Sequence, residues 1–274
     1  MPELPEVEAV ARSLDATVRG RTILSAELLR PRLAPENTPQ EFSEKLKGQT
    51  IEIVDRRGKH ILLHLSGGTT LIVHLRMSGR FLLVGSDEEQ PKFTHAAFDL
   101  DTGERLVFDD QRHFGLMKVV ETADLYEAKE LKKLAPEPFS TEFSVTYFLE
   151  TLKRSRRSVK ELLIDQTKVC GLGNIYACEA MFAAGVDPRK RSDLLSRPRA
   201  ARLHESIKMV LSEAIEFSTR TVEGITPNYF YGSNGAKWYV YDREGEPCAK
   251  CGSTIARIKQ GMRSTYFCRR CQRR

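Results

Sequence analysis

The spacing of apolar residues divides the chain into a first part typical of strands and a second part typical of helices. Between Pro5 and Gly20 the apolar positions repeat at helical spacing, with a proline in the first turn and a glycine as a stop. From Thr22 to about Val120 the pattern changes to short alternating or β-branched runs separated by glycine-containing turns. These runs predict strands near residues 50–54, 60–65, 70–75, 96–100 and 105–108. We expect one leading helix and about six to eight strands in a β-sandwich-like domain.

Helical patterns follow after about Thr122. They predict helices near residues 145–153, 159–166, 175–184 and 199–218, after a turn-forming Pro136-Glu137-Pro138. The expected fold class is α+β with several domains. The boundaries we predict are a β domain at 1–121, a linker at 122–140, a helical domain at 141–246 and a short cysteine-containing segment at 247–274.

Four cysteines near the C-terminus have the spacing of a metal site. Cys248-x2-Cys251 and Cys268-x2-Cys271 offer four thiolates to one tetrahedral zinc ion. Residues 253–259 and 264–268 predict two strands of a hairpin joined through 260–262. Four protein ligands leave no open position, so the zinc would be structural. Two disulfides or free thiols are the alternative, which a cytoplasmic address disfavours. Cys170 and Cys178 stand apart, and the sequence assigns them no role.

The excess of positive charge and its clustering indicate a protein that binds phosphate groups. The chain has a net charge of +6, with 41% hydrophobic and 29% charged residues. Residues 247–274 hold Lys and Arg but no Asp or Glu, and Lys153 to Lys160 form a second basic cluster. Two such clusters favour nucleic-acid binding over a merely solvated basic face. No apolar run approaches the roughly 20 residues of a membrane span, so we expect no membrane partner and a cytoplasmic location.

A glycine-rich turn precedes one of the predicted helices. In Gly171-Leu172-Gly173-Asn174 we expect one helix to end at Gly171 and the next to begin with Asn174 as its N-cap. Backbone N–H groups at such a helix start suit a phosphate. An ordinary turn between helices is the alternative, because two glycines alone are a weak signal.

The N-terminus offers a nucleophile. If Met1 is removed, Pro2 carries a secondary amine, and an α-amino group titrates near pH ~8, so part of it is neutral at working pH. Glu3 is adjacent and Glu6 is one helical turn further, so a carboxyl group could act as an acid. The alternative is an ordinary helix start whose acidic residues complement the helix dipole. The sequence does not show whether Met1 is removed.

Three motifs together resemble the signatures of the formamidopyrimidine-DNA glycosylase family. They are residues 1–8 (MPELPEVE), the Gly173-Asn174-Ile175-Tyr176 turn and the four-cysteine ribbon, in this order along the whole chain. The resemblance implies a two-domain clamp around double-stranded DNA, in which the helical domain at 141–246 is a helix-two-turn-helix domain closed by the zinc ribbon at 247–274. The damaged base would be rotated out of the stack. It implies a bifunctional glycosylase and abasic-site lyase of base-excision repair, which removes oxidised purines by a Schiff base and β,δ-elimination. The expected enzyme is a monomer with no cofactor beyond one structural zinc ion.

The resemblance also assigns roles to single residues. Pro2 would be the nucleophile, Glu3 the general acid and Glu6 a supporting carboxylate. Lys59 would contact phosphate and donate a proton in β-elimination, and Arg263 would assist δ-elimination. The DNA-contacting residues it implies are His95, Arg156 and Asn174, while Met77, Arg112 and Phe114 would fill the space left by the flipped base. Without the motifs, Met77 and Phe114 would be taken for core residues.

The chain departs from the family pattern in two places. His113 stands where a second Arg or Lys is more usual. Residues 223–238, in the loop that covers the flipped base in the family, are rich in aromatic residues here and leave lesion range and opposite-base preference undecided. Glu179 matches a carboxylate of the base pocket and favours a purine substrate.

Three alternatives remain open at this point. An enzyme of the endonuclease VIII type shares the fold and prefers oxidised pyrimidines. A non-catalytic lesion-binding protein would keep Met1, which turns the Pro2 nitrogen into an amide. A small zinc-ribbon transcription factor would leave about 240 residues unexplained.

Overall fold

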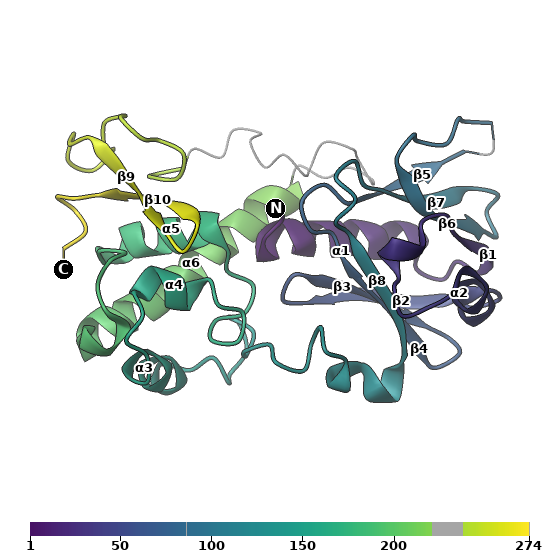
Figure 1. Ribbon diagram of the computed structural model, residues 1–274, viewed down its shortest axis with the longest axis horizontal. Coiled ribbons are helices and arrows are strands. Elements are labelled where there is room, and N and C mark those ends of the chain that lie inside the picture. The colour runs from purple at the N-terminus through teal and green to yellow at the C-terminus, as the bar shows by residue number, and fades with distance from the viewer. Residues whose placement is uncertain (86, 221–237, 274) are drawn as a thin grey trace. The chain divides into compact units, whose positions relative to one another are not determined.

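The computed structural model describes residues 1–85, 87–220 and 238–273 (Figure 1). Within these residues the chain forms two compact units. The first comprises residues 1–132 and the end of a long helix from Phe217, and the second comprises 133–216 and the C-terminal segment from 238. The linker expected at 122–140 overlaps the 3-10 helix η2 (Thr122–Glu127), which lies in the first unit. No helix among the described residues is long and apolar enough to cross a membrane.

The first unit is a β-sandwich with a leading helix, as the sequence predicts. Two four-stranded antiparallel sheets have the orders β1-β6-β7-β5 and β2-β3-β4-β8. The helices and strands before η2 are α1 (Leu4–Val18), β1 (Ile23–Leu28), η1 (Pro31–Leu33), α2 (Pro39–Leu46), β2 (Ile51–Arg57), β3 (His60–Leu65), β4 (Thr69–His74), β5 (Arg80–Val84), β6 (Thr94–Leu100), β7 (Arg105–Asp109) and β8 (Leu116–Glu121).

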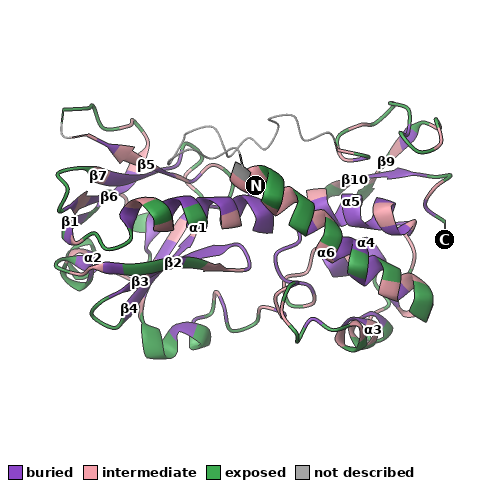
Figure 2. Ribbon diagram, turned by 180° about the vertical axis from the view of Figure 1, so that it is seen from behind, coloured by how far each residue is buried: buried purple, intermediate pink, exposed green. Residues whose placement is uncertain are grey.

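One apolar core holds this unit together. It joins the buried face of α1 to side chains from both sheets, among them Leu14, Phe98 and Phe108. Figure 2 shows buried residues concentrated in the strands and along α1. Fully burying an aliphatic or aromatic side chain of this size stabilises the fold by about 1.5–3 kcal/mol. The loops between β4 and β5 and between β7 and β8 are therefore attached to strands that a well-packed core holds in place.

The strand pattern does not predict helix α2. Phe42 and Leu46, four residues apart, are both buried in the core of the first unit. A capping box starts the helix: Glu41 N donates to Thr38 Oγ1 at 3.1 Å, and Thr38 N donates to Glu41 Oε2 at 2.8 Å. The Thr-Pro-x-Glu sequence is the signal that could have revealed this helix.

The second unit is helical and ends in a two-stranded ribbon. Its elements are α3 (Val145–Lys153), α4 (Val159–Leu163), α5 (Asn174–Ala184), η3 (Ser192–Leu194), α6 (Arg197–Arg220), β9 (Ile255–Gln260) and β10 (Arg263–Cys268). Two expectations about the turn before α5 are wrong. Helix α4 ends at Leu163, so no helix reaches Gly171, and the N-cap of α5 is Gly173 rather than Asn174.

The C-terminal ribbon packs on α5. Apolar contacts join Phe182 of α5 to Ile255 and Tyr266 of the hairpin. At the far end of the helix, Gln272 Nε2 donates to Val186 O at 2.9 Å. The helix is buried nearly all round, which explains why its apolar residues do not follow an amphipathic pattern.

Candidate functional site

The N-terminus places two carboxylates beside Pro2. Pro2 and Glu3 are buried, whereas Met1 is 43% exposed. Glu3 N donates to Glu6 Oε2 at 2.8 Å, and Glu6 N donates in return to the Glu3 carboxylate. This reciprocal pair starts α1 and fixes both acidic side chains next to the end of the chain. The motif is therefore a helix start and a preorganised acidic site together.

Lys59 lies in the tight turn between β2 and β3. Its side chain is 5% exposed, and the preceding Gly58 has a φ of +60°, a conformation that favours glycine. Behind it, His60 and His74 pack edge to face with ring centroids 4.7 Å apart. Burial lowers the pKa of His60 to about 4 and that of His74 to about 2. Both rings are thus neutral near pH 7.

Two loops of the first unit carry the residues expected to fill the space of a flipped base. Met77 lies between β4 and β5, and Arg112 and Phe114 lie between β7 and β8. Met77 is 43% exposed and Phe114 is 48% exposed, so neither is a core residue. The Arg112 guanidinium carbon lies 5.5 Å from the centre of the Phe114 ring. The structure thus leaves an aromatic ring, a cation and a thioether open to a ligand.

His95 is buried and contacts His113, the residue that departs from the family pattern. His95 Nε2 lies 2.9 Å from His113 Nδ1, and Arg30 Nη1 lies 3.0 Å from the same nitrogen. Because arginine only donates, His113 Nδ1 must accept, and His95 Nε2 is then a donor. Burial lowers the pKa of His95, although the nearby Asp110 carboxylate opposes this shift. His113 thus serves as a hydrogen-bond partner of His95 in place of a second full charge.

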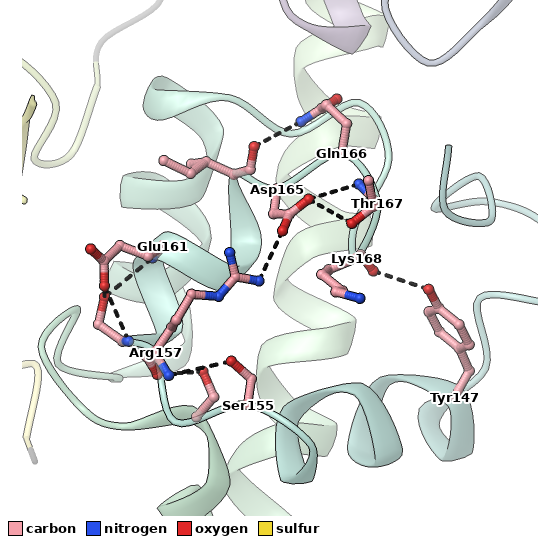
Figure 3. A network of polar contacts seen from close by, with 11 residues as sticks. Tyr147, Ser155, Arg157, Glu161, Asp165, Gln166, Thr167 and Lys168 are labelled. Atoms are coloured by element: carbon pink, nitrogen blue, oxygen red, sulfur yellow. Dashed lines mark hydrogen bonds and ion pairs between the residues drawn. The ribbon is translucent and has the colours of Figure 1, made fainter. Parts of the chain in front are cut away.

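Side-chain hydrogen bonds shape the turn that leads to α5 (Figure 3). Asp165 accepts from Thr167 N at 3.0 Å, from Thr167 Oγ1 at 2.8 Å and from Arg157 Nη2 at 2.8 Å. Gln166 donates to Leu172 O at 2.7 Å and accepts from Gly171 N at 3.0 Å. These bonds fold the chain into a turn where the sequence suggests a longer helix. The side chains of Asp165 and Gln166 thus fix the backbone of this turn, a part that the sequence analysis did not assign to them.

Asn174 connects this turn to the ribbon. Its Nδ2 donates to Ser264 O at 2.8 Å. An amide nitrogen carries two hydrogens, so one remains for a phosphate. Two arginines that the resemblance assigns to DNA binding or elimination, Arg156 and Arg263, are exposed in the same unit. Arg263 opens β10 beside the hairpin turn, where Met262 is 86% exposed.

The four ribbon cysteines form a site that fits zinc. Their sulfur atoms all lie within 4.8 Å of one another. The Cys248 and Cys271 sulfurs are 3.9 Å apart, and those of Cys251 and Cys268 are 3.5 Å apart. Tetrahedral zinc with Zn–S bonds of about 2.3 Å requires sulfur separations of about 3.8 Å. The donor set and its spacing therefore match one structural zinc ion, as the sequence predicts.

Glu179 anchors the chain that follows the expected recognition loop. Its carboxylate accepts the backbone N–H groups of Tyr239 at 2.9 Å, Val240 at 3.0 Å and Tyr241 at 2.8 Å. Burial raises the pKa of Glu179, and these bonds oppose the shift. A direct contact with the base stays a prediction. Residues 223–237 of the loop lie outside the described residues, and Trp238 packs edge-on against Tyr176 at 5.6 Å.

The predicted residues divide between the two units. The first unit brings together Pro2, Glu3 and Glu6 at the start of α1, and Met77, Arg112 and Phe114 on neighbouring loops. Lys59 and His95 belong to the same unit. The second unit contains Arg156, Asn174, Glu179, Arg263 and the four cysteines.

Comparison with known proteins matches three parts of the chain to domain families. Residues 1–117 match the formamidopyrimidine-DNA glycosylase N-terminal domain, and residues 134–225 match its H2TH domain. Residues 245–274 match a zinc finger found in FPG and IleRS. Formamidopyrimidine-DNA glycosylases of Bacillus licheniformis and Ruegeria pomeroyi are each 42% identical to the chain, with 100% of both chains covered.

Solved structures of this family are also similar to the chain. The chain matches Lactococcus lactis Fpg in complex with DNA containing N7-benzyl-Fapy-dG, with a TM-score of 0.91, 33% identity and full coverage of both chains. It also matches the enzyme of the same species bound to DNA containing an abasic site, with a TM-score of 0.90, 33% identity, and 99% of this chain and 100% of that chain covered. The motifs at the N-terminus, at the turn before α5 and in the ribbon thus all lie within the matched domains. The chain belongs to the formamidopyrimidine-DNA glycosylase family.

Proposed function

We propose that this protein is a bifunctional DNA glycosylase and abasic-site lyase that excises oxidised purines in base-excision repair. The observation that carries the proposal is the N-terminus, where Pro2 adjoins two carboxylates held by reciprocal hydrogen bonds. Removal of Met1 leaves a secondary amine at this position. The Lactococcus lactis relative was solved with Fapy-dG and abasic-site DNA, which are a substrate and an intermediate of this chemistry.

The chemistry follows from an amine beside a carboxylic acid. The Pro2 nitrogen attacks C1′ of the damaged nucleotide and the glycosidic bond breaks. The base leaves with the bonding electrons and takes up the proton that the Pro2 nitrogen gives up. Glu3 protonates the sugar oxygen as the ring opens, which gives an iminium between Pro2 and C1′. The Glu3 carboxylate, now deprotonated, or a water molecule takes the C2′ proton, and the iminium accepts the electrons of that bond. The 3′ phosphate then leaves by β-elimination with the electrons of the C3′–O bond. We propose that Lys59 is the proton donor in β-elimination. Arg263 would bind the phosphate in δ-elimination.

Binding would depend on hydrogen-bond donors and cations of both units. His95 and Arg112 of the first unit, with Arg156, Asn174 and Arg263 of the second, supply donors for phosphates and for the orphaned base. When bound, zinc supplies the cross-link that holds the hairpin carrying Arg263. Phosphate contacts of this kind make affinity fall steeply with salt. We propose that the protein acts as a monomer on double-stranded DNA in the cytoplasm, with no cofactor beyond zinc.

Oxidised pyrimidines are a second class of candidate substrate. A Lactococcus lactis relative, 34% identical with a TM-score of 0.91, was solved in complex with DNA containing an oxidised pyrimidine. The residues expected to select the base, 223–237, lie outside the described residues. The first assays should therefore include both classes of lesion.

Borohydride trapping tests the proposal. Wild-type protein, Pro2→Gly, Glu3→Gln and a form that retains Met1 are incubated with duplexes carrying an oxidised guanine, an oxidised pyrimidine or an abasic site. We expect a covalent adduct with the wild type, none when Met1 is retained, and a strongly reduced yield with Glu3→Gln on intact lesions. Binding to the abasic duplex without any adduct would refute the enzyme and support a lesion-binding protein.

A further inference from the structure

A buried carboxylate joins the two loops that carry Met77, Arg112 and Phe114. Asp110 is fully buried at the start of the loop between β7 and β8. Its Oδ1 accepts from the hydroxyl of Ser78, which lies next to Met77 in the other loop. The Ser78 oxygen accepts in turn from Arg112 N at 3.0 Å. A chain of hydrogen bonds thus links the backbone of Arg112 to the residue after Met77.

The same carboxylate also fixes the far end of its own loop. Asp110 Oδ2 accepts from Gly115 N at 2.7 Å, directly after Phe114. Asp110 O accepts from His113 N at 3.1 Å, and Asp110 Oδ1 lies 3.3 Å from Arg112 N. The backbone on both sides of Phe114 is therefore tied to Asp110. A buried carboxylate is costly without donors, so the loop is held in the shape that supplies them.

Two glycines let both loops pack on one aromatic ring. A Cβ at Gly79 would come within 2.6 Å of the Phe108 ring, and a Cβ at Gly115 within 2.7 Å of the same ring. Phe108 is fully buried in the core of the first unit. Both loops thus pack closely against the Phe108 ring, and the hydrogen bonds of Asp110 and Ser78 connect them to each other.

We propose that Asp110 and Ser78 are positioning residues for base extrusion, which hold Met77, Arg112 and Phe114 ready to fill the space of the departing base. The inference rests on the proposed function. Exposed side chains on separate loops would otherwise lose freedom when they enter the DNA stack, and this cost would slow extrusion. Neither Asp110 nor Ser78 needs to touch DNA for this role.

Two substrates separate this role from a general loss of structure. Excision of an oxidised guanine paired with cytosine requires a stacked base to leave the helix, whereas an abasic site has no base to unstack. We expect Ser78→Ala and Asp110→Asn to slow single-turnover excision by about tenfold or more while changing abasic-site cleavage by less than about twofold. Ser78→Thr keeps the hydroxyl and should restore most of the excision rate.

The first unit contains a matched control. Ser25 donates to Asp99 in the sheet β1-β6-β7-β5, so Ser25→Ala removes a serine–aspartate bond away from both loops. This variant should excise at the wild-type rate. Equal losses on both substrates, accompanied by a lower melting temperature, would show that Asp110 and Ser78 only stabilise the fold and would overturn the inference. Unchanged excision by Ser78→Ala would overturn it as well.

The failure of the proposed function has a different signature. If the wild type cleaves neither substrate, the glycosylase proposal is wrong and the inference falls with it. If the wild type cleaves both substrates and the variants match it, the enzyme stands and only the positioning role fails.

Discussion

The β-sandwich and the C-terminal ribbon are stabilised in different ways, the first by an apolar core and the second by a site for zinc. The sandwich surrounds an apolar core drawn from α1 and both sheets. The ribbon has alternating half-exposed positions along β9, and its apolar cluster includes Cys248 and Cys268 themselves. So short a segment buries too little surface to fold alone, and metal bonds replace the missing core. The two regions should therefore fail under different perturbations.

The largest expected effect is loss of zinc. Structural zinc binds zinc-finger peptides with about 10–16 kcal/mol, so Cys251→Ser or a strong chelator should unfold the ribbon. DNA affinity should drop by about 100-fold or more because the phosphate contacts of the ribbon are lost. Zinc content and titration of labelled duplex measure both effects. Cys170→Ala, which removes a buried cysteine outside the cluster, is the control and should keep its zinc.

A core substitution should produce the opposite pattern. Leu14 is fully buried in the sandwich, and Leu14→Ala should lower the free energy of unfolding of the first unit by about 2–5 kcal/mol. Zinc content should stay at one ion per chain. Leu24, 54% exposed in the same unit, is the matched control: Leu24→Ala should change stability by less than about 0.5 kcal/mol. Loss of zinc from Leu14→Ala would contradict the independence of the two regions.

Acid should weaken the sandwich through a buried histidine. Burial lowers the pKa of His60 to about 4, below the ordinary value of 6.5. Between these values the unfolded chain binds more protons, so stability falls as pH drops from 6.5 toward 4. Lowering the pH from 7 to 5 should cost up to about 2 kcal/mol from this residue. Urea titrations across this range measure the slope. His60→Gln should reduce it, and the slope that remains includes the contribution of His74, whose pKa burial also lowers.

The smallest effect expected is at the cap of α2. Thr38→Ala removes the side chain that accepts from Glu41 N and should cost about 1 kcal/mol in the unfolding of the first unit. Thr38→Ser keeps the hydroxyl and should be close to wild type. Equal stability of Thr38→Ala and the wild type would mean that packing of Phe42 and Leu46 alone holds the helix.

The sequence predicts the elements whose pattern is long or whose spacing is chemically strict. Helix α1, the alternating strands and the cysteine ribbon fall in these classes, and the structure confirms them. The pattern fails for α2, which has only two buried residues, and for the turn before α5. There the side chains of Asp165 and Gln166 accept hydrogen bonds from backbone N–H groups that a helix would otherwise use. The spacing of apolar residues gives no sign of such side-chain bonds.

Site residues divide in a similar way. The position of Glu3 and Glu6 follows from helix spacing alone. The exposure of Met77 and Phe114 does not follow from the apolar pattern, since without the motif both residues would be taken for core residues. The role of Asp110 depends on Ser78, which lies 32 residues away in the sequence, so only tertiary structure brings them together.

The carboxylate of Glu179 has a consequence for protein engineering. Helix α6 defines the chain before residue 221, and Glu179 fixes Tyr239 to Tyr241 after residue 237. A graft that replaces residues 221–237 would therefore begin and end at segments that the structure describes. Exchange of residues 221–237 for the corresponding segment of a relative would test whether lesion preference moves with this segment.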